Sequence, residues 1–124
     1  MLIVVIAVIS LAAAGAIVVS LNSRVETQQT QAGRTERYYF FNRLVGERNF
    51  TGDKASGPTR TYYPAGTVKS EFEYKDGKRH GTARHYTEEG NLRFLDEYAE
   101  DKRVSRKEFD ERGNLLSESK EAAS

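Results

Sequence analysis

A repeat of 23 to 24 residues in the C-terminal part of the chain limits its fold more than any other feature. An aromatic residue recurs at this spacing; a glycine follows it by four positions, and a valine or leucine follows the glycine by two. The three sets are Tyr62, Tyr86 and Phe109; Gly66, Gly90 and Gly113; and Val68, Leu92 and Leu115. Repeats of this length are typical of stacked supersecondary units, each of which buries apolar residues against its neighbours.

Each unit has the pattern of a β-hairpin. Val68–Lys75 alternates, which places Val68 with Phe72 and Tyr74 on one face and charged side chains on the other. This period of two is typical of a strand with one solvated face. Asp76-Gly77 has the composition of a two-residue type I′ turn, which needs positive φ at both positions. We therefore predict an antiparallel meander of about six short strands over residues 51–118.

The predicted core of this meander consists of its inward-facing aromatic and aliphatic residues, and its predicted turns contain glycine. The core residues are Tyr62, Val68, Phe72, Tyr74, Tyr86, Leu92, Phe94, Tyr98, Phe109 and Leu115; the turn glycines are Gly66, Gly77, Gly90 and Gly113.

These motifs resemble the variant MORN-repeat family of bacterial proteins over about residues 52–118. The resemblance rests on Tyr62-Tyr63-x-x-Gly66-x-Val68, Tyr74-x-Asp76-Gly77-Lys78-x-x-Gly81 and Tyr86-x-x-x-Gly90-Asn91-Leu92. It implies the repeat fold and no catalytic residues; family members include proteins labelled antitoxins and membrane- or lipid-anchored proteins. The third unit has Asp101 where Gly77 stands and Ser105 where Gly81 stands, which predicts a poorer turn and a terminal, capping repeat.

An uncharged, almost wholly apolar run extends from Leu2 to Leu21. A helix of this length would cross the hydrocarbon core of a bilayer, roughly 30 Å thick. We therefore predict a retained transmembrane helix over residues 1–21. A cleaved signal peptide is the alternative, because Ala12-Ala13-Ala14 offers a cleavage site, but the run lacks a basic leader and is too long. The small residues Ser10, Ala12, Gly15 and Ala16 predict a face that packs against a partner helix, from another copy or a larger complex.

Residues 22–50 are predicted to form a stalk, which is helical or an extended linker. Ser23 and Glu26 have the spacing of a capping box, which favours the helix. The aromatic run Tyr38–Phe41 is then predicted to pack on the hydrophobic face of the sheet. An apolar helix, a polar helix and an antiparallel sheet also resemble the layout of a mature type IV pilin, although Val5 stands where most bacterial pilins carry glutamate.

The predicted organisation is a transmembrane helix at 1–21, a stalk at 22–50, a β-repeat domain at 51–118 and a tail at 119–124. The first basic residue, Arg24, follows the apolar run, so the positive-inside rule places the domain in the cytoplasm. It would lie outside if a leader had been removed before Met1.

Composition narrows the function. Nineteen Lys and Arg against 18 Asp and Glu leave a net charge of +1, which lacks the basic excess that nucleic-acid binding needs. There is no cysteine, and His80 and His85 lack further ligands at metal-binding spacing. We therefore expect no enzyme, no cofactor, no metal, no nucleic acid and no small-molecule substrate.

The expected function is that of a membrane-anchored structural or interaction protein, as an accessory or scaffold subunit of a membrane assembly. Its expected partners are membrane lipid and a protein helix. A pilin-like filament subunit and an antitoxin- or immunity-type binding module are the alternatives.

Overall fold

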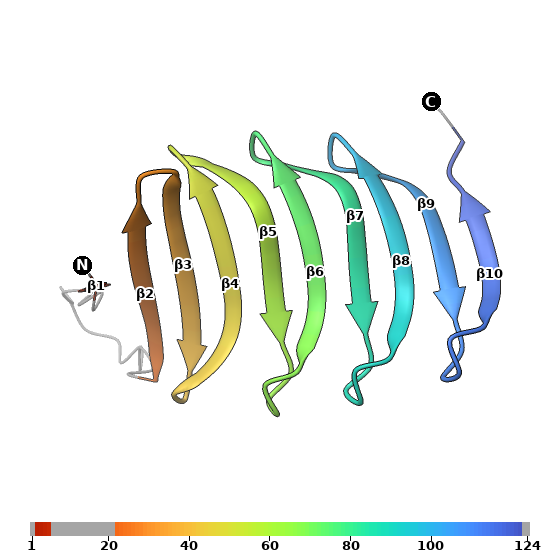
Figure 1. Ribbon diagram of the computed structural model, residues 1–124, viewed down its shortest axis with the longest axis horizontal. Coiled ribbons are helices and arrows are strands. Elements are labelled where there is room, and N and C mark those ends of the chain that lie inside the picture. The colour runs from red at the N-terminus through yellow and green to blue at the C-terminus, as the bar shows by residue number, and fades with distance from the viewer. Residues whose placement is uncertain (1, 6–21, 123–124) are drawn as a thin grey trace, which may run out of the picture.

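The computed structural model describes residues 2–5 and 22–122, and every regular element in them is a β-strand. The strands form one antiparallel sheet in sequence order, β1 to β10, which is a single-layer meander (Figure 1). They are β1 (Leu2–Val5), β2 (Ser23–Thr30), β3 (Gly33–Phe40), β4 (Arg43–Thr51), β5 (Lys54–Tyr62), β6 (Val68–Lys75), β7 (Lys78–Tyr86), β8 (Leu92–Ala99), β9 (Lys102–Phe109) and β10 (Leu115–Lys120). The predicted antiparallel meander is confirmed, but the sheet has more strands than predicted, because four precede β5.

From β4 onward, two kinds of turn alternate along the sheet, one at each end of the strands (Figure 1). At the upper ends of the strands, Asp76 and Gly77 join β6 to β7 with φ of 51° and 82°, as a type I′ turn requires. At the lower ends of the strands, wide turns join β5 to β6, β7 to β8 and β9 to β10. The glycines of these turns, Gly66, Gly90 and Gly113, have φ between 82° and 94°. In each wide turn the glycine N–H donates to a carbonyl three residues earlier. The sequence repeat thus reproduces the same backbone geometry three times.

The turn between β8 and β9 is well formed, although a poorer one was predicted from Asp101. Glu100 and Asp101 adopt φ of 49° and 69°. The backbone N–H of Arg79 donates to Oδ1 of Asp101 at 2.8 Å, and the N–H of Asp101 donates to the Arg79 carbonyl at 3.0 Å. Aspartate tolerates the left-handed region better than most residues. These bonds attach the turn to the preceding unit, as the bond from Gly77 N–H to the Ala55 carbonyl does one unit earlier.

Residues 22–50 form strands β2, β3 and most of β4, so the predicted helical stalk is wrong. Each of these strands is antiparallel to the next and pairs with it, with a bulge between β3 and β4, and β4 pairs with β5. A sheet edge presents unpaired N–H and C=O groups that bind a further strand, and this outweighs the local preference of Ser23 and Glu26 for a helix. Tyr38–Phe40 lie within β3, so the aromatic run is part of the sheet and not a cover on its face.

Leu2–Val5 form β1, which pairs with Val25–Gln28 of β2, so the helix predicted for residues 1–21 is wrong at these positions. The rest of that segment, with the predicted packing face of Ser10, Ala12, Gly15 and Ala16, lies outside the described residues. Within the described residues, no helix has the length and apolarity to cross a bilayer. The predicted pilin-like layout is also wrong, because β2 and β3 form where that layout has a polar helix.

The sheet has almost no interior, because no second layer of described residues covers it. Ala83 is the one buried hydrophobic side chain in the described part of the chain. Most of the predicted core residues are half-buried, and Leu115 is 52% exposed. They also divide between the two faces. Phe72, Phe94 and Tyr98 share one face with His85, which we call the aromatic face.

β-Bulges cause this division. Thr61 pairs with Ser70 but Tyr62 pairs with Val68, which leaves Lys69 as an extra residue. Val68 was predicted to lie on the face of Phe72; instead, it lines a hollow with Glu71 and Tyr86. The same bulge recurs between β7 and β8, where Arg93 is the extra residue.

Candidate interaction surfaces

A row of charges alternates in sign across β3 to β7. Its members are cross-strand partners and therefore share a face, which we call the ladder face: Arg37, Glu47, Arg60, Glu71 and Arg84. Glu47 accepts from Nε of Arg37 at 2.8 Å and lies 3.7 Å from Arg60; Glu71 accepts from Nε of Arg60 at 2.5 Å and lies 3.5 Å from Arg84. Opposite-charge pairs across strands stabilise a sheet by about 0.2–1 kcal/mol each. The ladder thus holds the register of a sheet that has little apolar interior.

The ladder extends the repeat to an N-terminal unit that the sequence reasoning missed. The basic residue stands two positions before the aromatic residue in every unit. The pairs are Arg37 and Tyr39, Arg60 and Tyr62, Arg84 and Tyr86, and Lys107 and Phe109. The spacing between a basic and an aromatic residue in Arg37-x-Tyr39 could have identified β3 and β4 as a repeat unit.

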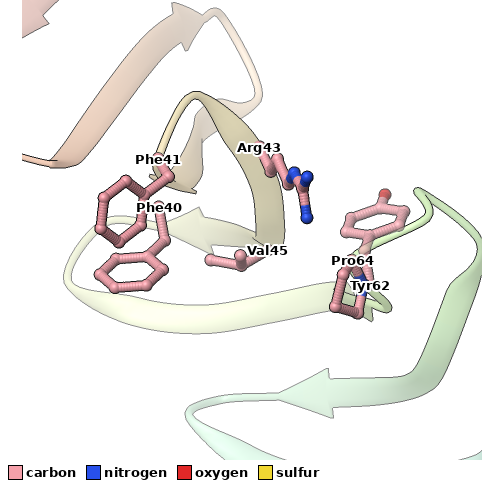
Figure 2. A pocket seen from close by; sticks show the side chains of 6 residues that line it. All are labelled: Phe40, Phe41, Arg43, Val45, Tyr62 and Pro64. Atoms are coloured by element: carbon pink, nitrogen blue, oxygen red, sulfur yellow. The ribbon is translucent and has the colours of Figure 1, made fainter.

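An apolar hollow of about 520 Å³ lies beside the turn between β3 and β4. We call it the apolar hollow; its lining is Phe40, Phe41, Arg43, Val45, Tyr62 and Pro64 (Figure 2). The rings of Phe40 and Phe41 pack edge to face, with their centroids 4.6 Å apart. Both rings lie to one side of the turn, and Val45 lies between them and Tyr62 (Figure 2). Phe40, Phe41 and Val45 are 48%, 60% and 38% exposed. Phe41 also has φ of 47°, which is rare for a bulky residue.

Asp96 is the most deeply buried charged side chain among the described residues, with no exposed surface. Arg106 donates from Nε and from a terminal nitrogen to the two carboxylate oxygens, each at 2.7 Å, and His85 Nε2 lies 3.3 Å from Oδ2. Burial acts to raise the pKa of Asp96, but the bonds from Arg106 and the charges nearby outweigh it and lower the pKa. Burial lowers the pKa of His85, although the charge of Asp96 opposes this.

A second hollow, of about 570 Å³, lies over this cluster, and we call it the basic hollow. Its lining includes the rings of Tyr63, Phe72, His85 and Phe94. Three cations, Lys69, Arg93 and Arg106, also line it, together with Ser70, Tyr86 and Thr87, and the lining contains no carboxylate. Aromatic and cationic groups together suit a ligand that carries both an apolar group and a negative charge.

The two histidines do not form a shared site. His80 is exposed on β7, where it lies close enough to Glu100 to lower the pKa of that carboxyl, an effect smaller than that of Lys78. His85 packs between Phe72 and Phe94 and faces Asp96. In the described part of the chain, no three side chains of His, Cys, Asp or Glu group as metal ligands would.

The fold and surfaces define a single-layer protein of β-hairpin repeats. The family described as "MORN repeat variant" matches residues 56–76 and 79–100, which are most of the β5–β6 and β7–β8 hairpins. This match confirms the resemblance drawn from the sequence at residues 56–76 and 79–100.

No curated protein matches the chain. Among solved structures, it is similar to a crystal structure of a point mutant of S. aureus TarM in complex with Fondaparinux, alpha-GlcNAc-glycerol and UDP. The TM-score is 0.50 at 12% identity, over 64% of this chain and 16% of that chain. The chain therefore spans less than a fifth of the length of that protein, and the likeness concerns the fold alone.

Proposed function

We propose that this protein is a non-enzymatic interaction module that acts as an accessory or scaffold subunit of a membrane assembly. The observation that carries the proposal is the exposed apolar cluster of Phe40, Phe41 and Val45 at the apolar hollow. The proposed partner is a protein chain, with membrane lipid nearby; nucleic acid and small-molecule substrates are not part of the proposal.

The chemistry of the cluster supports a protein contact. Neighbouring aromatic side chains that stay exposed on a protein surface mark interaction sites, and aromatic residues contribute much of the binding energy of such contacts. The positive φ of Phe41 carries a steric cost. A partner that covers the ring would offset that cost.

The position of the cluster supports a site next to a membrane. The N–H of Phe41 donates to the Asn22 carbonyl at 2.8 Å, so the exposed phenylalanines lie beside the residue that follows the apolar run Leu2–Leu21. The part of that run that follows β1, residues 6–21, carries no charge and is almost wholly apolar, so it is suited to burial among lipid chains. With residues 6–21 in a membrane, the apolar hollow lies next to the membrane surface, where a second subunit of the assembly would meet it.

Site-specific photo-cross-linking tests the proposal. A benzophenone amino acid replaces Phe41 in the full chain in its native host, and a control carries it at Glu111 in the exposed wide turn between β9 and β10. We expect a discrete protein adduct from position 41 that position 111 does not give, and that Val45→Asp abolishes. The same adducts from both positions, or adducts with lipid alone, would contradict the proposal. Alkaline extraction of membranes tests whether the apolar segment before Asn22 anchors the chain. Release of the chain from the membrane would contradict this part of the proposal.

A further inference from the structure

We propose that the basic hollow on the aromatic face binds an acidic peptide segment of a protein partner, with a carboxylate between Lys69 and Arg93 and a neighbouring apolar side chain on Phe72 and Phe94. This inference rests on the proposed function as an interaction module. It assigns that module a second surface, formed by other residues than the apolar hollow.

The charges at the hollow leave an excess for a ligand. Arg106 is engaged by Asp96, and Arg93 donates to Glu108 at 2.8 Å. Lys69 forms no ion pair with any carboxylate of the described residues; its Nζ lies 5.7 Å from the centre of the Tyr63 ring. Three cations therefore face two carboxylates, and one positive charge remains for an incoming anion.

The bulges place Lys69 and Arg93 in equivalent positions of successive repeats. Lys69 and Arg93 are the extra residues of the bulges that β5–β6 and β7–β8 share, so they occupy the same place in successive repeats. Strands lie about 4.8 Å apart, which separates β6 from β8 by roughly 10 Å. A carboxylate that lies between them reaches both cations, while the aromatic rings of Phe72 and Phe94 contact its apolar neighbour.

At the bulge position, cations occur only in the two central repeats, which favours a peptide over a membrane surface. The same bulge position holds Val45 in the β3–β4 unit and Leu116 in the β9–β10 unit. An anionic membrane would favour a cation at this bulge position in every unit, because a flat surface contacts all units. A single aromatic hollow with a cationic rim instead fits one short segment.

The test measures binding of a fluorescein-labelled hexapeptide of alternating glutamate and leucine to the full chain in mild detergent, by fluorescence anisotropy at low salt. A peptide with glutamine in place of glutamate is the matched probe. We expect the acidic peptide to bind about tenfold more tightly than the amide peptide, and Lys69→Glu to remove that difference. Lys120→Glu, an equal charge change on the exposed strand β10, is the control and should leave binding unchanged.

Three results would overturn the inference. They are equal binding of the two peptides, acidic-peptide binding that survives both Lys69→Glu and Arg93→Gln, and binding only to phosphatidylserine vesicles. Lys69 is exposed and without an ion pair among the described residues, so its replacement should not impair folding. Cross-linking from position 41 reports on the apolar hollow independently, so failure here and failure of the proposed function are distinguishable.

Discussion

Replacement of Asp96 by asparagine should destabilise the sheet more than any change of a surface carboxylate. Asp96 has no exposed surface and accepts two bonds from Arg106 at 2.7 Å. Breaking a buried ion pair costs about 3–5 kcal/mol. The Arg106 side chain is 32% exposed and regains some water, so we expect a loss of about 2–3 kcal/mol.

The loss should depend on pH with a definite sign. The pKa of Asp96 is lowered in the folded state, so its contribution is present above the unfolded pKa, about 3.9, and disappears as pH falls through the folded pKa. The asparagine variant lacks this titration. The two proteins should therefore differ most near neutral pH and converge in acid.

Urea unfolding measures both effects, with circular dichroism and the fluorescence of seven tyrosines, in the absence of tryptophan, as the probes. Glu111→Gln neutralises an exposed carboxylate in a wide turn and serves as the control. A loss below about 1 kcal/mol, or a difference that stays constant down to acid pH, would refute the argument that the buried pair stabilises the fold.

Three further predictions follow from single contacts. Leu95 interrupts the charge ladder between its strand partners Arg84 and Lys107. Leu95→Glu should therefore be more stable than Leu95→Gln by up to about 0.5 kcal/mol in urea unfolding, and about 1 M salt should remove this gain. Gly33→Ala should cost at least about 1 kcal/mol more than Gly52→Ala on thermal unfolding, because its Cβ would lie 2.0 Å from the Phe50 carbonyl oxygen, whereas nothing lies within 4 Å at Gly52. The pKa of His85 in an NMR titration should lie below the usual value and fall further in Asp96→Asn, which removes the negative charge that opposes the effect of burial; an unchanged pKa would contradict the contact.

The hairpins from β5 to β10 could be predicted from the sequence because their determinants are local. Alternation in Val68–Lys75, the Asp76-Gly77 pair and a glycine at each wide turn specify strands and turns within a few residues of one another. The surfaces could be predicted less well. His85 and Asp96 are not neighbours in sequence, and only the pairing of β7 with β8 brings them to one face.

What the sequence determined by itself was therefore the repeat, its turns and its resemblance to the MORN variant repeat. The tertiary structure decided the rest. Residues 22–50 contain a helix-capping pattern, and they become β2 to β4 only because the sheet edge supplies hydrogen-bond partners for an added strand. Likewise, strict alternation places Val68 with Phe72, and the bulge that separates them exists only when Tyr62 on β5 pairs with β6. Both outcomes depend on contacts between strands, and the pattern within a single strand does not encode them.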